Sequence, residues 1–262
     1  MKVKIKSDFH LEQSVKKKVA IWILIILLVG VPIVFAIWAY TPPAPMPQAL
    51  AALESDAQVF VRVDEWAFFE PIKNRADTAF ILYPGGRVDF RSYAPAARAI
   101  AEAGYPVFIL SMPFNLAVFD IDRAADVMAA YPEIQNWVVG GHSLGGAMAA
   151  NYAVQNPEDV QGLLLWAAYP ASSDDLSGMN IEVTSIYATR DGLSTGEKID
   201  QSRSLLPADT IWMAIEGGNH AQFGWYGDQA GDLPAEISRE TQQEQIVAAS
   251  IALLERVERG QR

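Results

Sequence analysis

An uncharged run of 22 residues, Val19 to Tyr40, limits how this chain of 262 residues can fold. The run is rich in isoleucine, leucine and valine. As a helix it would be about 33 Å long, enough to cross the hydrocarbon core of a bilayer. It exceeds the apolar region of a usual signal peptide, and no clear A-x-A cleavage site follows it. We therefore predict an uncleaved transmembrane helix over residues 19–40, with Trp22, Trp38 and Tyr40 near its two ends.

The two flanks of this run differ in charge. Residues 1–18 hold six lysines against Asp8 and Glu12, whereas a proline-rich stretch follows the run. Because positively charged flanks stay on the cytoplasmic side, residues 1–18 are predicted to be a basic cytoplasmic tail, and the remaining chain to be extracytoplasmic at the cell membrane. Residues 41–57 are expected to form a semi-rigid linker.

Charge and cysteine content exclude several kinds of site. The net charge of −11 argues against a nucleic-acid partner. The chain has no cysteine, which excludes disulfides, thiolate metal ligands and a cysteine nucleophile. We expect neither a cofactor nor a metal.

Residues 58–262 read as one domain of alternating strands and helices. The expected strands are short, nearly continuous apolar runs, which is typical of a parallel sheet covered by helices on both faces. Strands are predicted at 59–63, 66–70, 79–83, 107–110, around 137–139, and at 162–168, 183–188 and 210–215. Helices are predicted at 93–103, 120–131, after residue 146, and at 196–206 and 238–258.

The fifth of these strands runs into a G-x-S-x-G motif, residues 141–145, followed by an alanine-rich helix. In this strand–turn–helix context the motif predicts a nucleophile elbow, with Ser143 exposed on a strained turn. The glycines leave room for the backbone of the neighbouring strand and helix.

A serine hydroxyl needs a base within hydrogen-bond reach to act as a nucleophile. Only three histidines are present. His10 precedes the apolar run, and the side chain of His142 should point away from that of its neighbour Ser143. His220 follows the last predicted strand, where sites in α/β sheets form, and is therefore the predicted base.

An acid must orient this histidine, and the expected chain order is serine, acid, histidine. Asp191 fits this order because it directly follows a predicted strand. Asp174 and Asp175, in the preceding loop, are the alternatives, whereas Asp209 precedes the last strand and lies at its wrong end.

An oxyanion hole needs two backbone donors. One should be the N–H of Leu144, the residue after the nucleophile. The other should lie within Gly85-Gly86-Arg87, after the third strand, at Gly86 or Arg87.

Four segments give the chain a resemblance to the α/β-hydrolase superfamily, and within it to the bacterial α/β-hydrolase fold-5 type family. They are Tyr83–Asp89, Met112–Phe119, Gly140–Ala147 and Glu216–Gly224. The resemblance implies Ser143, Asp191 and His220 as a catalytic triad. It also implies hydrolysis of a small ester-like substrate, a carboxylic ester or a thioester, through an acyl-enzyme and without a cofactor.

Residues 169–180 leave room for a loop only, so we expect no sizeable lid. Phe223, Trp225 and Tyr226 are expected either to wall the substrate pocket or to pack in the core. Two alternatives stay open at this point. In the first, the domain is a catalytically idle binding or scaffold module. In the second, it is an acyltransferase that uses the same three residues.

Overall fold

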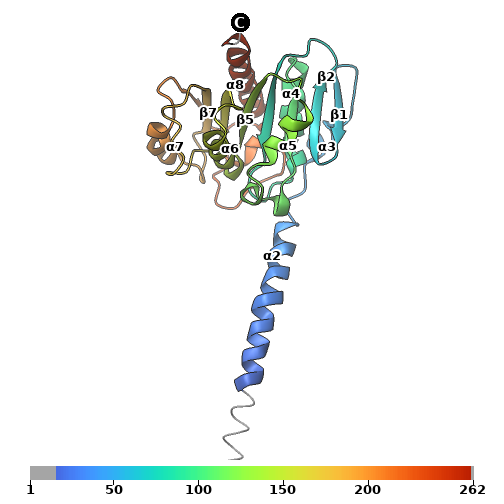
Figure 1. The fold of residues 1–262 in the computed structure, drawn as a ribbon, viewed down its shortest axis with the longest axis vertical. Coiled ribbons are helices and arrows are strands. Elements are labelled where there is room, and N and C mark those ends of the chain that lie inside the picture. Colours follow the sequence, from blue (N-terminus) through green and yellow to red (C-terminus); the bar gives the residue numbers. More distant parts are fainter. Residues whose placement is uncertain (1–15, 261–262) are drawn as a thin grey trace, which may run out of the picture. The chain divides into compact units, whose positions relative to one another are not determined.

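The computed structural model describes residues 16–260, and the chain divides after Thr41 into two compact units. The first is a helical segment, Lys16–Ala39, which contains the π-helical turn η1 (Ile26–Gly30) and helix α2 (Val31–Ala39) (Figure 1). Its mean hydropathy is 3.0, and its large apolar side chains are exposed. These properties fit either a membrane span or a signal sequence. Most of the predicted basic tail lies outside the described residues.

The second unit is built on an eight-stranded sheet, in which β1, β2 and β4 pair antiparallel and all other neighbours pair parallel. The strand order is β1-β2-β4-β3-β5-β6-β7-β8. The strands are β1 (Val59–Val63), β2 (Trp66–Pro71), β3 (Thr78–Tyr83), β4 (Val107–Leu110), β5 (Asn136–His142), β6 (Gly162–Trp166), β7 (Glu182–Ala188) and β8 (Ile211–Ile215). The predicted α/β fold with a mostly parallel sheet is therefore confirmed.

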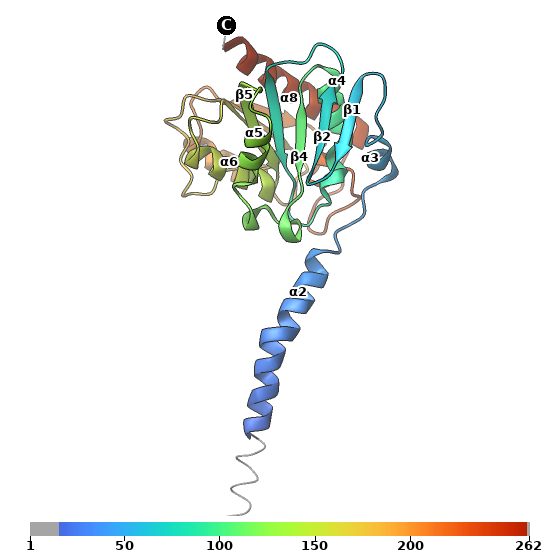
Figure 2. The ribbon, with the colours of Figure 1, turned by 45° about the vertical axis from the view of Figure 1, so that its right-hand side comes forward.

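Helices cover both faces of this sheet (Figure 2). One face packs against α4 (Ala94–Glu102) and α8 (Arg239–Gly260), and the other against α5 (Arg123–Ala130) and α6 (Leu144–Gln155). The shorter helices are α3 (Pro47–Ala51) and α7 (Gly196–Ser202). Single turns of 3-10 helix are η2 (Phe90–Tyr93), η3 (Pro113–Asn115), η4 (Ala117–Phe119), η5 (Arg203–Leu205) and η6 (Ala221–Phe223).

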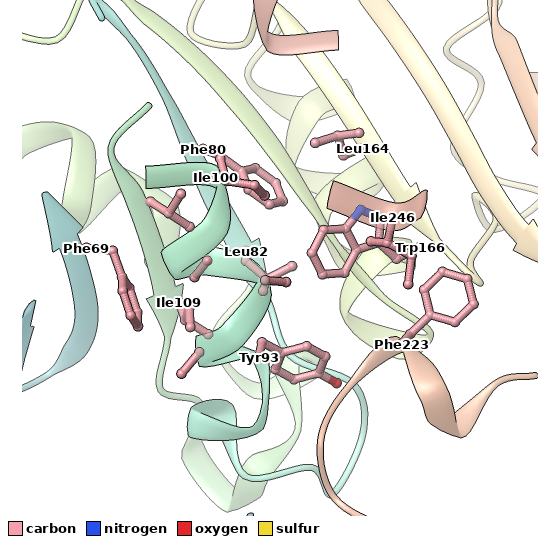
Figure 3. Close-up of a cluster of buried hydrophobic side chains, with 14 of the residues drawn as sticks. Phe69, Phe80, Leu82, Tyr93, Ile100, Ile109, Leu164, Trp166, Phe223 and Ile246 are labelled. Carbon is pink, nitrogen blue, oxygen red and sulfur yellow. The ribbon is translucent and has the colours of Figure 1, made fainter. Parts of the chain in front are cut away.

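Strand β3 illustrates why the sheet is apolar on both faces. Successive side chains of a strand point to opposite faces. Phe80 and Leu82 therefore enter the cluster beneath α4 and α8, while Ile81 and Tyr83 enter the one beneath α5 and α6. Figure 3 shows the first cluster, in which Phe80 and Leu82 lie beside Ile100 of α4.

The structure differs from the sequence expectation at two helices. The semi-rigid linker expected over residues 41–57 contains α3, whose Ala49 is buried, and Met46 N–H donates to the Trp225 carbonyl over 2.8 Å. Helix α5 begins at Arg123 rather than at Asp120. The preceding turn η4 ends with Asp120 in a non-helical conformation, so the helix cannot extend further back.

Candidate active site

Ser143 lies on the sharp turn between β5 and α6. Its φ of 53° and ψ of −123° are strained for a residue with a side chain. The turn is held in register because Ser143 N–H donates to the carbonyl of Trp166 in the neighbouring strand over 2.9 Å. This is the conformation expected of the elbow.

The glycines around Ser143 are required by close backbone packing. A Cβ on Gly141 would lie 2.5 Å from the carbonyl oxygen of Tyr83, and one on Gly145 would strike the same oxygen. A Cβ on Gly146 would lie 2.5 Å from the carbonyl oxygen of Gly141. Side chains at these positions would push α6 off the sheet. The close packing of the backbone therefore requires glycine at these positions of the motif.

Asp191 and His220 form a buried pair at the carboxyl ends of two neighbouring strands. Asp191 follows β7, His220 follows β8, and His220 Nδ1 lies 2.7 Å from Asp191 Oδ2. Both side chains are fully shielded from solvent. The other oxygen of Asp191 accepts hydrogen bonds from the backbone N–H groups of Leu193 and Ser194, at 2.8 and 2.7 Å. One oxygen of the carboxylate is therefore fixed by backbone N–H groups, and the other oxygen orients the imidazole of His220.

The second ring nitrogen of His220, Nε2, is buried and makes no hydrogen bond with any described residue, Ser143 included. In a ligand-free site the hydrogen bond between nucleophile and base is often long and tightens only when substrate binds. Of the two ring nitrogens of His220, Nε2 is therefore the one available to a proton from a substrate or nucleophile.

Backbone hydrogen bonds distinguish the three residues predicted to supply the second oxyanion donor. Gly85 N–H donates to the Tyr93 hydroxyl over 2.9 Å, and Arg87 N–H donates to the Asn115 carbonyl over 2.7 Å. Between them, Gly86 N–H has no hydrogen bond within residues 16–260. A Cβ on Gly86 would lie 3.2 Å from the side chain of Leu144, so these two residues are adjacent. Of Gly86 and Arg87, only Gly86 keeps its N–H available.

The alternative acids lie in other surroundings. Asp174 accepts hydrogen bonds from Asn151 and Ser173, at 3.0 and 2.8 Å, and Asp175 accepts one from the backbone of Ser177. Neither contacts a histidine in the described part of the chain.

Two side chains that the sequence analysis did not select also border this region. The Tyr93 hydroxyl lies 2.9 Å from Nδ1 of His142, and the rings of His142 and His220 are 4.5 Å apart at their centres. Burial, followed by the nearby His220, lowers the pKa of His142 well below its usual value of 6.5. We expected only that the His142 side chain points away from that of Ser143; in the structure its ring also packs against the predicted base.

A cavity of about 360 Å³ lies beside Gly86. It has both polar and apolar walls, formed by Pro43, Gly86, Arg87, Val88, Tyr226, Asp228, Gln229 and Ala230. Phe223 and Trp225 are buried in the core instead. Residues 169–180 contain neither helix nor strand. No group of three or more potential metal-binding side chains occurs within residues 16–260.

In a comparison with known families, the alpha/beta hydrolase family matches residues 79–244. This match spans more than half of the chain and includes β3, the elbow, Asp191 and His220. The chain belongs to the alpha/beta hydrolase family. The predicted resemblance is thereby confirmed.

Solved structures of other alpha/beta hydrolases have the same fold. A dienelactone hydrolase from Anabaena variabilis has 15% identity and a TM-score of 0.56, with 75% of this chain and 98% of that chain covered. A structure from a study of two fungal esterases of Rhizomucor miehei has 15% identity and a TM-score of 0.56, with 81% of this chain and 86% of that chain covered. A serine hydrolase homologue from Coxiella burnetii has 14% identity and a TM-score of 0.53, with 74% of this chain and 98% of that chain covered. No curated protein sequence matches the chain.

Proposed function

We propose that this alpha/beta hydrolase is a membrane-anchored serine hydrolase that cleaves a carboxylic ester or a thioester. The observation that carries the proposal is the buried Asp191–His220 pair, whose only unpartnered nitrogen is Nε2, together with a serine on a strained elbow in the same fold.

In the proposed reaction, Ser143 Oγ attacks the carbonyl carbon of the substrate while its proton moves to Nε2 of His220. The electron pair of the carbonyl bond moves to oxygen. When this tetrahedral intermediate collapses, the bond to the leaving alcohol or thiol breaks, and His220 returns the proton to that group. Water then repeats the sequence and releases the acid. Asp191 holds the imidazole with its proton on Nδ1 and stabilises the imidazolium.

The negative oxygen of the intermediate would be bound by the N–H groups of Leu144 and Gly86. Leu144 begins α6, so its N–H has no partner within the helix. Gly86 is adjacent to it and its N–H is unused. Two donors of this kind stabilise charge that develops only in the transition state.

We propose that the cavity beside Gly86 receives one arm of the substrate. At about 360 Å³ it is at the small end of ligand sites, and Arg87, Asp228 and Gln229 give it polar walls. This lining favours short or polar groups over a long alkyl chain. A loop in place of a lid over residues 169–180 supports activity without interfacial activation.

We propose further that the apolar helix remains as a membrane anchor, with the hydrolase domain outside the cytoplasm. Its length of 24 residues supports this reading over a cleaved signal, and the lysines at its start support the orientation. If the helix were cleaved, mass spectrometry of the mature protein would show a mass without it. Extraction of membranes with carbonate would then release the protein. A protease added outside intact cells should reach the domain.

The reaction is tested by labelling the full-length protein with a fluorophosphonate and by turnover of nitrophenyl esters of increasing acyl length. We expect labelling that is lost in S143A, and faster turnover of short acyl chains. A folded protein that neither reacts with the probe nor hydrolyses esters and thioesters would indicate an idle binding module. Transfer of the acyl group to an added alcohol in preference to water would indicate an acyltransferase.

A further inference from the structure

The loop that carries the proposed oxyanion donor is held by a hydrogen-bonded pair of buried side chains outside the triad. Gly85 N–H donates to the Tyr93 hydroxyl, which lies 2.9 Å from His142 Nδ1. Tyr93 follows the loop in the turn η2, and His142 is the last residue of β5. Both side chains are fully buried. The pair therefore ties the loop after β3 to the strand that ends in the nucleophile.

The direction of these two hydrogen bonds follows from the chemistry of the groups. A backbone N–H can only donate, so the Tyr93 oxygen accepts from Gly85 and its own proton is directed elsewhere. Burial raises the pKa of Tyr93, which keeps the phenol protonated. His142 Nδ1 must then accept, which places the His142 proton on Nε2 and keeps the ring neutral. The lowered pKa of His142 agrees with this assignment.

The absence of a side chain at Gly85 has its explanation in the same pair. A Cβ there would lie 2.7 Å from His142 Nδ1 and 3.0 Å from the Tyr93 hydroxyl. The two side chains thus occupy the space beside the Gly85 backbone. Figure 3 shows Tyr93 at the edge of the cluster beneath α4, with its hydroxyl directed toward the loop that carries Phe223.

His142 also contacts the loop of the predicted base. Its ring is stacked on Phe223, with centres 5.6 Å apart and planes at 11°, and lies 4.5 Å from the ring of His220. An interaction of the His142 ring with the backbone of His220 opposes the lowering of the His142 pKa. Nε2 of His142 nevertheless makes no hydrogen bond of normal geometry with a described residue. One imidazole therefore lies between the loop of the oxyanion donor and the loop of the base.

We propose that Tyr93 and His142 are positioning residues that fix Gly85 so that Gly86 N–H points into the oxyanion site. By engaging the N–H of Gly85, the Tyr93 hydroxyl fixes the Pro84–Gly85 peptide plane, which adjoins the Gly85–Gly86 peptide that carries the Gly86 N–H. The carbonyl of that second peptide accepts from Val88 N–H over 3.1 Å. The acceptor on His142 fixes the rotation of the Tyr93 hydroxyl. This assignment rests on the proposed serine hydrolase function. The coupling of Tyr93 to the Gly86 amide can, however, be measured without substrate turnover.

The kinetic test compares Y93F with Y152F, which removes a partly buried tyrosine hydroxyl whose one hydrogen bond within residues 16–260 is to Met128 Sδ, at 3.6 Å. Because an oxyanion donor acts in the transition state more than in the ground state, Y93F should lower kcat about 10- to 100-fold while KM changes less than about twofold. Y152F should keep wild-type kcat. Equal kcat in Y93F and Y152F, with both folded by thermal unfolding, would overturn the proposal.

Two substitutions of His142 separate its hydrogen bond from its ring. H142N keeps an acceptor near the Nδ1 position but loses the aromatic ring, whereas H142F keeps the ring and loses the acceptor. If the hydrogen bond positions the loop, H142N retains the higher kcat, and H142F combined with Y93F is little worse than either alone. The opposite order, with H142F the more active, would show that ring packing matters instead and would refute the assignment.

A measurement independent of activity uses the full-length protein with ¹⁵N-labelled glycine. Y93F should shift the amide signals of both Gly85 and Gly86, and Y152F should shift neither. If the wild-type protein proves inert to esters, the proposed function fails while this result still decides the positioning role. An unchanged Gly86 signal in Y93F would overturn it.

Discussion

Replacing Asp191 by asparagine tests the orientation of His220 with little change in shape. The asparagine oxygen can keep the hydrogen bonds from Leu193 and Ser194 N–H, so its amide NH₂ group must face His220 Nδ1. Nδ1 then has to accept, the ring proton moves to Nε2, and Nε2 can no longer take a proton from Ser143. We expect kcat to fall about 10⁴-fold, which corresponds to about 5 kcal/mol of transition-state stabilisation.

The same substitution should cost much less in stability. Three charge-assisted hydrogen bonds become neutral ones, so D191N should lower the free energy of unfolding by about 2 kcal/mol. D191A leaves Leu193 N–H, Ser194 N–H and His220 Nδ1–H unpaired and should cost more than about 3 kcal/mol. Ester turnover and urea unfolding of both variants give the comparison. D174N is the matched control, because Asp174 is also buried but contacts only Asn151 and Ser173. More than a tenth of wild-type activity in D191N, or an equal loss in D174N, would refute the reasoning.

Three further predictions concern the elbow and its neighbour. S143G should be more stable than S143A by about 1 kcal/mol, because glycine accepts the φ of 53° without strain, and neither variant should react with a fluorophosphonate; equal midpoints in urea would contradict this. G145A should lose more than about 2 kcal/mol of stability because its Cβ meets backbone oxygens, whereas G178A, with nothing within 4 Å, should be neutral in the same assay. Because the pKa of His142 is depressed in the folded protein, the unfolded chain binds a proton below about pH 6.5 that the folded chain does not, so stability should fall by about 1.4 kcal/mol per pH unit below that value. H142N should show a shallower fall, and an identical slope would refute a neutral buried His142.

The strands and the elbow were predictable because each depends on local pattern. An apolar run such as Val107–Leu110 is buried on both faces whatever its neighbours are. The turn at Ser143 requires glycines at fixed offsets, and these are visible in the sequence. The order of Ser143, Asp191 and His220 along the chain follows from the fold, so the three candidates could be named before their geometry was known, and their roles stay predictions.

Contacts made through space were not predictable. Tyr93 and His142 are 49 positions apart, and no local pattern marks Tyr93 as the partner of a histidine. The exclusion of His142 considered only the direction of adjacent side chains and not the loop of His220 folding back over it. The packing of the linker expected at residues 41–57 was not predictable for the same reason, because the acceptor for Met46 N–H is the carbonyl of Trp225, far along the chain. Choosing Gly86 over Arg87 required knowing that Asn115 occupies the Arg87 amide.

The glycine contacts beneath the elbow determine where sequence variation can change this protein's preference for substrates. At Gly141, Gly145 and Gly146 any side chain would meet neighbouring backbone or the Cβ of Ala168, so mutation there reduces folded yield before it changes selectivity. The cavity wall, by contrast, includes Asp228 and Ala230, whose side chains are exposed. Libraries intended to alter substrate range should vary those two positions and leave the elbow unchanged.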